Sequence, residues 1–291
     1  MYTFDELIDR RHTESTKWDR YQDKLQRDDL LPMWLADMDL PASDEIKEAL
    51  MKRASHPIYG YSDRGRLYYE VFAERFQKQY AYDITADDVM LSTGVMYSIA
   101  AAIHLFTNPK DGILLLMPCY HPFVTCVENS DRRVIPVDMC VHDQQYEIDF
   151  EQLENRLKKD DTVKALILCN PHNPIGKLWS REELTQINAL CRKHHVIVIS
   201  DEIHYELCEP GKKYLPFASV NTSCLQNSIT CLSASKAFNL AGLQAACVVI
   251  ADEGIRNRIW RGFHTDEVAE PNVFACEASI AAWIEGKDWL K

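Results

Sequence analysis

Apolar and polar positions follow one another in a pattern typical of an α/β protein. From residue 87 onward, short apolar runs are separated by longer stretches with helical periodicity. Near-continuous apolar runs of this kind are typical of parallel strands that are covered on both faces. The pattern predicts an open, mostly parallel sheet flanked by helices. Its strands are expected at 89–91, 112–117, 133–137, 163–169, 196–200, 228–232 and 245–250.

Helical periodicity and capping signals mark the other elements. Ser43 precedes an acidic first turn and is an expected N-cap. Ser180 and Glu183 have the spacing of a capping box, in which each side chain bonds the other residue's backbone N–H. Helices are expected at 43–54, 67–80, 96–106, 149–158, 180–194, 253–262 and 274–290.

The N-terminal part of the chain has no such periodicity. Residues 1–31 are polar and charged, and the segment 32–41 that follows carries two acids, Asp37 and Asp39, amid large apolar residues. A proline at each end of this segment favours an extended conformation. The segment is either a linker packed on a core or one wall of a cleft, and the pattern alone does not decide between them.

Composition narrows the function classes. A chain of 291 residues can form one large α/β domain or two smaller ones. The net charge of −12 disfavours nucleic acid or an anionic membrane as a partner. Ten cysteines without a C-x-x-C pair indicate reduced thiols, and no apolar run is long enough to span a bilayer or form a signal peptide. We therefore expect a cytoplasmic protein.

Lys236 is the strongest single candidate for chemistry. It follows Ser233 and Ser235 after an apolar strand, and its neighbours are small or apolar. Poor solvation lowers the pKa of a lysine and allows its amine to form a Schiff base with an aldehyde cofactor. Taken alone, such a lysine is more often a solvated loop residue.

Four further features each follow an expected strand. Gly94 and Val95 open a helix, where free N–H groups and the helix dipole favour a small phosphate. Tyr120 lies where a flat ring could stack, and Asn173 lies in a loop stiffened by prolines. Asp201 is a strand-end carboxylate that needs a cation if it is buried. Singly, Tyr120 could be a core aromatic and Asp201 a helix cap or structural ion pair.

Together these residues fit one ligand. Ligands of open α/β sheets bind beyond the carboxyl ends of the strands. A phosphate, a pyridine nitrogen, a ring hydroxyl and an aldehyde are the four groups of pyridoxal phosphate (PLP). The sequence therefore predicts PLP as the cofactor. No spacing of histidine, cysteine and acidic residues fits a metal site, so no metal is expected.

The sequence also resembles the MalY/PatB-type cystathionine beta-lyase (C-S lyase) family, a branch of the class I/II aminotransferases with the fold-type I architecture of PLP enzymes. The resemblance extends over essentially the whole chain. It is carried by the motifs Met33-Trp34-Leu35-Ala36-Asp37-Met38-Asp39, Tyr59-Gly60-Tyr61, Asn170-Pro171-His172-Asn173-Pro174, Ser200-Asp201-Glu202-Ile203-His204 and Ser235-Lys236-Ala237-Phe238-Asn239-Leu240-Ala241-Gly242.

This resemblance implies a contact for each part of the cofactor ring. Lys236 would form the Schiff base, and Asp201 would bond the ring nitrogen. Asn173, with His204 beside it, would bond the ring hydroxyl. Tyr120 would stack on the ring face.

Contacts to the phosphate and to the substrate are implied as well. The N–H groups of Gly94 and Val95 and the hydroxyl of Ser233 would bind the phosphate. Tyr61 would reach the phosphate of a neighbouring subunit, which implies a homodimer. The implied substrate contacts are Trp34, Ala36 and Asn173.

Two departures from the family pattern are expected to matter. Related aminotransferases carry an arginine eight residues after the lysine, where this chain has Gln244. The family's chain also continues for about a hundred further residues. The sequence is therefore expected to be a fragment, with residues 1–45 as cleft wall and part of a small domain, 46–275 as the large PLP domain, and 276–291 as the start of the C-terminal small domain.

The resemblance implies a lyase reaction on an amino-acid thioether. A cysteine S-conjugate or cystathionine would undergo α,β-elimination to a thiol, pyruvate and ammonia. Two alternatives stay open: a class I/II aminotransferase, and a MalY-like regulatory protein with residual lyase activity.

Overall fold

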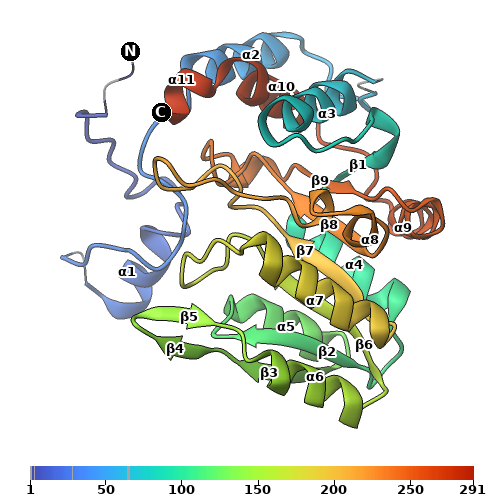
Figure 1. The fold of residues 1–291 in the computed structure, drawn as a ribbon. Helices are drawn as coiled ribbons and strands as arrows, with labels where there is room; N and C mark the ends of the chain where they lie inside the picture. The colour runs from blue at the N-terminus through green and yellow to red at the C-terminus, as the bar shows by residue number, and fades with distance from the viewer. Residues whose placement is uncertain (1, 3, 28, 64–65) are drawn as a thin grey trace.

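A seven-stranded sheet forms the centre of the computed structural model, which describes residues 2, 4–27, 29–63 and 66–291 (Figure 1). From one edge to the other, its strands are β1 (Val89–Ser92), β9 (Ala246–Val249), β8 (Ser228–Leu232), β7 (Ile197–Asp201), β6 (Val163–Cys169), β2 (Gly112–Met117) and β3 (Arg133–Asp138).

The sheet is mostly parallel, as the apolar runs predicted. Strands β8, β7, β6, β2 and β3 are parallel to one another, whereas β9 is antiparallel to both β8 and β1. The antiparallel return from β8 to β9 keeps the connecting loop, residues 233–245, at the carboxyl edge of the parallel strands. Lys236 lies in this loop.

Helices cover both faces of the sheet. Along β2, Ile113 and Leu115 pack into one core while Leu114 and Leu116 pack into another, because successive side chains of a strand point to opposite faces. The first face is covered by α4 (Val95–Phe106), α5 (His121–Asn129) and α9 (Glu253–Thr265). The second is covered by α6 (Phe150–Lys159), α7 (Arg181–Lys193) and the short α8 (Thr222–Gln226).

A third group of helices packs beside the β1 end of the sheet (Figure 1). It consists of α2 (Asp44–Ser55), α3 (Leu67–Tyr80), α10 (Ala275–Glu285) and α11 (Lys287–Leu290). Phe72, Phe76 and Trp283 are buried between these helices. The domain boundaries expected from the sequence stay a prediction.

The prediction of a single helix at 274–290 was wrong, because this stretch is divided at Gly286 into α10 and α11. A Cβ on Gly286 would lie 2.4 Å from the ring of Phe238 and 2.5 Å from the carbonyl oxygen of Ala282. The absence of a side chain at Gly286 therefore lets the junction of α10 and α11 approach Phe238, in the loop that carries Lys236.

Other elements were absent from the sequence-based expectation. They are α1 (Asp19–Leu25), α5, α8, the hairpin of β4 (Cys140–His142) with β5 (Gln145–Glu147), and the 3-10 helices η1 (Ala86–Asp88), η2 (Phe217–Ser219) and η3 (Ala241–Leu243). The hairpin turns through Asp143 and Gln144, which both have positive φ. This turn lacks the glycine that usually signals such a conformation.

Candidate active site

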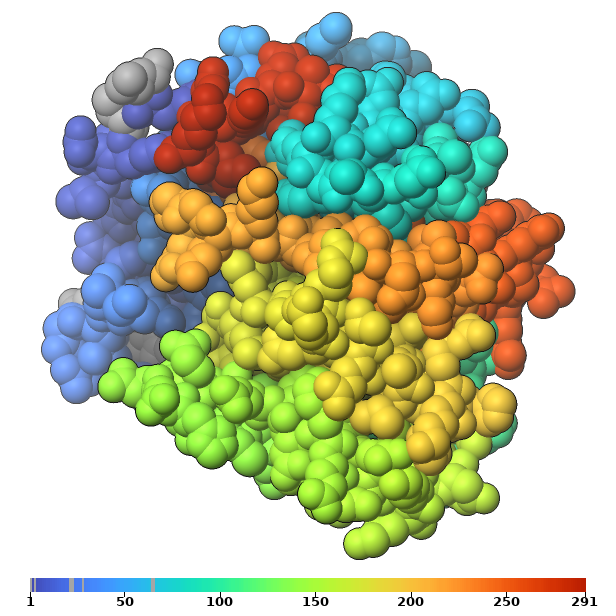
Figure 2. Space-filling model, in the orientation of Figure 1, coloured from blue at the N-terminus to red at the C-terminus, as the bar shows by residue number. Residues whose placement is uncertain are grey.

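A cavity of about 520 Å³ opens at the carboxyl edge of the parallel strands. In Figure 2 the N-terminal segment, in blue, lies along this side of the molecule. The cavity lining contains every residue that the sequence placed in the site except Tyr61: Trp34, Ala36, Gly94, Val95, Tyr120, Asn173, Asp201, His204, Ser233 and Lys236. Segments from six parts of the chain thus meet at one place: five of them follow strands that end at the same edge, and the sixth is the N-terminal segment 33–36.

Lys236 is half-buried in this cavity, and its Nζ donates a hydrogen bond to the carbonyl oxygen of Ala36 at 3.0 Å. Burial lowers the pKa of Lys236, while the nearby carboxylates of Asp37 and Asp201 act in the opposite direction. Burial disfavours the charged ammonium, so a larger share of the amine is neutral than for a solvated lysine.

Asp201 is the buried carboxylate of the site, with 4% of its surface exposed. One of its oxygens accepts the backbone N–H of Ile203 at 3.1 Å. Burial raises the pKa of Asp201 to about 6, against the lowering effects of that hydrogen bond and of Lys236. Among the described residues, Asp201 has no ion-pair partner within 4.0 Å, so its environment fits a cationic ligand group.

Next to Asp201, a buried network holds the strand ends together. Glu202 is fully buried and accepts hydrogen bonds from the Ser200 hydroxyl at 2.6 Å, the Phe217 N–H at 3.0 Å and the Tyr214 hydroxyl. The side-chain amide of Asn170 bonds the Leu215 carbonyl at 2.9 Å and lies 3.5 Å from the Glu202 carboxylate. The sequence analysis missed this network, although the Asp201-Glu202 pair at a strand end was a signal for it.

Asn173, His204 and Tyr120 line the same part of the cavity. Neither Asn173 nor His204 has a side-chain hydrogen bond to another described residue in the structure, so both can bond a ligand. Burial lowers the pKa of His204 to about 4, and the nearby Lys236 acts in the same direction. Tyr120 is 36% exposed, with its ring edge-on to Phe123 at 5.4 Å.

Polar groups at the start of α4 form another end of the cavity. The N–H groups of Val95 and Met96 have no hydrogen-bond acceptor among the described residues, as expected for a helix start. The Ser233 hydroxyl donates to the Ala245 carbonyl at 2.6 Å and accepts the Ser235 N–H at 3.0 Å. Ser235 also lines the cavity and was missed by the sequence analysis.

In the described part of the chain, no arginine lines the cavity. Gln244 is one of the lining residues, and its backbone is left-handed. An anion here would therefore be held by N–H groups, hydroxyls and the α4 dipole.

The cleft wall at 34–36 is the N-terminal contribution to the site. Asn239, three residues after Lys236, fixes the segment that follows this wall. Its side-chain oxygen accepts the Met38 N–H at 3.0 Å, and its amide donates to the carbonyls of Met38 and Leu40, each at 3.0 Å. Residues 33–36 line the cavity, which is the position that a cleft wall would have.

Tyr61 lies outside this cavity. Its side chain is fully exposed, and it lines a separate hollow with Asp63 and Tyr69. Residues 2, 4–27, 29–63 and 66–291 contain no group of three metal-ligating side chains. The same residues contain no helix long and apolar enough to cross a membrane.

Comparison with known proteins relates this geometry to a family. The model of the family described as aminotransferase class I and II matches residues 35–271. Cystathionine beta-lyase PatB of Bacillus subtilis (strain 168) is 38% identical over 99% of this chain and 74% of its own length. Protein MalY of Escherichia coli (strain K12) is 31% identical over 100% of this chain and 74% of its own length.

A solved structure supports the same relationship. Crystalline cystalysin from Treponema denticola, which contains a pyridoxal 5'-phosphate cofactor, superposes with a TM-score of 0.95 and 30% identity. The match covers 100% of this chain and 74% of the cystalysin chain. The predicted resemblance and fold class are confirmed, and the chain belongs to the class I and II aminotransferase family, in its branch with PatB and MalY.

Proposed function

We propose that this protein is a PLP-dependent carbon–sulfur lyase that acts on cystathionine and related cysteine S-conjugates. The observation that carries the proposal is the meeting of Lys236 and Asp201 in one cavity, a poorly solvated amine beside a buried carboxylate. The relative PatB, itself named a cystathionine beta-lyase, supports this choice of reaction. Sulfur amino-acid metabolism is the corresponding context.

The residues of the cavity fit the ring of the cofactor. Bound PLP supplies an aldehyde and an electron-accepting ring, which acidify the Cα–H of an amino acid and let a Cβ substituent leave. Asp201 would hold the proton on the ring nitrogen, because a buried carboxylate is stabilised by a cation. Asn173 and His204 would bond the ring hydroxyl, and Tyr120 would cover one ring face.

The start of α4 fits the phosphate. The N–H groups of Gly94, Val95 and Met96 and the positive end of the helix would meet an anion directly. Ser235 would add a hydroxyl donor, and the Ser233 hydroxyl would add another on turning away from the Ala245 carbonyl, to which it donates in the structure. The helix dipole and these donors would together take the role of the missing arginine.

Lys236 would have two tasks in turn. It would hold the cofactor through its amine, and after the substrate amine replaces it, the freed amine would take the proton from Cα. A lowered pKa favours this step because the neutral amine is the base. The hydrogen bond to the Ala36 carbonyl would keep Nζ within the cavity, and Trp34 would face the substrate from the same wall.

The reaction consumes only the thioether substrate and water. Breakage of the Cβ–S bond expels the thiol, and hydrolysis of the remaining three-carbon part gives pyruvate and ammonia. L-Cystathionine and water would therefore yield homocysteine, pyruvate and ammonia.

We also propose a cytoplasmic homodimer. All ten cysteines are free, which suits a reducing compartment. Tyr61 is fully exposed and lies outside its own cavity, so it is available to a neighbouring subunit.

An assay with L-cystathionine tests the proposed reaction. Pyruvate and free thiol should appear together, in equal amounts and without an added keto acid, and Lys236→Ala should abolish both. The family model favours transamination as the second candidate. Turnover that requires a keto-acid acceptor and releases no thiol would establish that alternative. A regulatory protein would instead keep its biological effect when Lys236 is replaced.

A further inference from the structure

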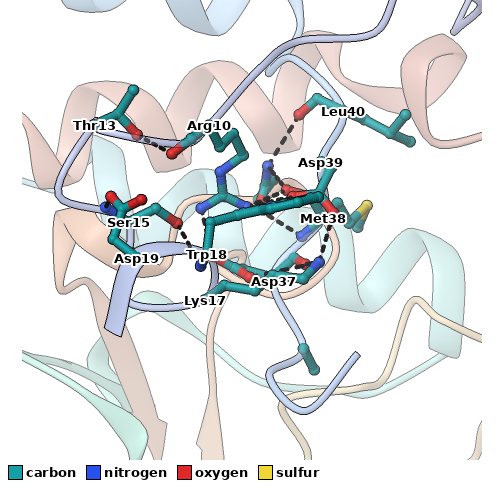
Figure 3. Close-up of polar contacts among 12 residues, drawn as sticks. Arg10, Thr13, Ser15, Lys17, Trp18, Asp19, Asp37, Met38, Asp39 and Leu40 are labelled. Atoms are coloured by element: carbon teal, nitrogen blue, oxygen red, sulfur yellow. Dashed lines mark hydrogen bonds and ion pairs between the residues drawn. The ribbon is translucent and has the colours of Figure 1, made fainter. Parts of the chain in front are cut away.

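A cluster of opposite charges joins the N-terminal segment to residues 37–39, which directly follow the cleft wall (Figure 3). Arg10 bonds Asp37 at 2.8 Å and Asp39 at 2.7 Å. Lys17, only 7% exposed, bonds Asp39 at 2.7 Å, and the indole N–H of Trp18 donates to the same carboxylate at 2.8 Å. Two cations thus face two carboxylates, and the pairs are partly buried.

Two of these three N-terminal residues, Lys17 and Arg10, also bond the backbone of the segment that follows the wall. Lys17 Nζ donates to the Asp37 carbonyl at 2.8 Å, and Arg10 donates to the Met38 carbonyl at 3.1 Å. In return, the indole N–H of Trp34 donates to the Lys17 carbonyl at 3.1 Å. The wall is therefore held from its outer side by the segment 10–18.

The inner side of the wall meets the lysine of the candidate site. The Ala36 carbonyl that accepts Lys236 belongs to the residue just before Asp37. Displacement of Asp37 would move this carbonyl. A second hollow, of about 550 Å³, is lined by Arg10, Asp37 and Asp39 and also by Lys236, so the cluster and the lysine share one space.

We propose that Arg10, Lys17 and Trp18 are positioning residues that hold Asp37 and Asp39, and through them the cleft wall 34–36, against Lys236. We call these five residues the N-terminal clamp. The inference rests on the proposed function for its catalytic consequence. Its structural part, the anchoring of residues 34–40, is independent of that function.

The clamp also sets the charge that Lys236 faces. The titratable groups that act on Lys236, or are acted on by it, are Asp37, Asp201 and His204. Arg10 and Lys17 offset the negative charge of Asp37, whereas Asp201 lies on a separate strand. Loss of the clamp cations leaves Asp37 unopposed and admits water to the wall. Both changes favour the protonated form of Lys236, so both raise its pKa.

Three variants separate the charge of the clamp from its geometry. Arg10→Gln and Lys17→Met each remove a cation, whereas Arg10→Lys keeps the charge but loses the forked contacts to both carboxylates and the Met38 carbonyl. Arg27→Gln is the matched control, since Arg27 pairs with Asp29 at an exposed site that lines none of these hollows.

For the loaded enzyme, we expect two results. In Arg10→Gln and Lys17→Met, the pH midpoint of the visible band of the lysine-bound cofactor should rise by about one unit, and the KM for L-cystathionine should rise about tenfold with a smaller change in kcat. Arg10→Lys should have the same pH midpoint as the unchanged protein, but its KM should be raised as in the cation-removing variants. Arg27→Gln should match the unchanged protein. Unaltered midpoint and KM in both cation-removing variants would overturn the proposal.

Hydrogen exchange on the cofactor-free protein tests the anchoring alone. Amides of residues 34–40 should exchange at least tenfold faster in Lys17→Met than in the unchanged protein or Arg27→Gln, while amides of the central sheet keep their rates. Equal exchange at 34–40 would refute the clamp. If the unchanged protein shows no lyase activity but this difference appears, the proposed function fails and the clamp stands.

Discussion

The Nζ of Lys236 lies 3.0 Å from the carbonyl oxygen of Ala36, a residue 200 positions earlier in the chain. This contact joins the loop between β8 and β9 to the N-terminal wall. Asn239 makes a second connection between the same two segments. The lysine of the candidate site is therefore positioned by the N-terminal segment as well as by its own loop.

Replacement of Lys236 by alanine should remove the visible absorption band of the bound cofactor. Turnover should fall by about 10³-fold or more, because both the amine that holds the cofactor and the base are lost. Spectra and pyruvate release measure the two effects. Lys177→Ala is the control, since Lys177 bonds Glu183 at 3.0 Å and lines a neighbouring hollow but not the cavity. A band retained in Lys236→Ala would contradict the assignment.

Replacement of Asp201 by asparagine should change the free energy of unfolding in opposite directions with and without the cofactor. In the cofactor-free fold, burial raises the pKa of Asp201 from 3.8 to about 6. Between these values the folded state binds more protons than the unfolded state, so the free energy of unfolding falls as pH rises through this window. Asparagine carries no charge and can still accept the Ile203 N–H.

At pH 7, cofactor-free Asp201→Asn should therefore be more stable than the unchanged protein, by about 1–3 kcal/mol. With saturating PLP the order should reverse, because only the carboxylate pairs with a protonated ring nitrogen. Urea unfolding of both forms measures this. A variant that is less stable in the cofactor-free form would contradict the inference that Asp201 lacks a cation.

Glu202→Ala should destabilise the fold and weaken cofactor binding. The hydroxyls of Ser200 and Tyr214 and the N–H of Phe217 would lose their shared buried acceptor, which costs about 1–3 kcal/mol or more. The strand end that carries Asp201 would also lose support. Thermal unfolding and PLP titration test this, with Glu154→Ala as control because Glu154 pairs with lysines at an exposed site. Equal melting temperatures for the two variants would contradict the prediction.

The sequence was sufficient to predict the sheet and to predict that the cavity residues meet. One physical reason explains both. Parallel strands buried on both faces are continuously apolar, and the polar residues that follow them must share an edge, as Asn173 and Asp201 do. The family and fold predicted from these motifs are confirmed. The roles of the individual site residues stay predictions.

The N-terminal clamp could not be predicted in this way. Arg10 pairs with Asp39 over 29 positions, and nothing in a chain with 44 acidic residues marks which acid a given arginine will meet. The partners of Glu202 were hidden for a similar reason, because Tyr214 lies in an irregular stretch and Phe217 begins the three-residue helix η2, which is too short to show periodicity. Contacts that depend on loop paths leave no period in the sequence.

His204 should not set the pH dependence of activity near neutrality. Burial lowers its pKa to about 4, so the imidazole is neutral throughout the range from pH 6 to 9. In this range His204→Gln should change kcat/KM by a constant factor, without moving either limb of the pH profile. An acidic limb that shifts by more than half a unit in this variant would show that His204 titrates in the working enzyme.

Asn239→Ala should raise the KM more than it lowers kcat. Asn239 makes three hydrogen bonds to the backbone of Met38 and Leu40, and their loss frees the wall that carries Ala36. The free energy of unfolding should fall by about 1–3 kcal/mol, since these backbone groups are partly buried. Asn221→Ala gives a matched control, because Asn221 caps α8 through the Cys224 N–H at 2.9 Å and does not line the cavity. Its stability should fall by about 0.5–2 kcal/mol with an unchanged KM. A similar KM in both variants would mean that the effect of Asn239 is only on stability, and that the wall keeps its position against Lys236 without it.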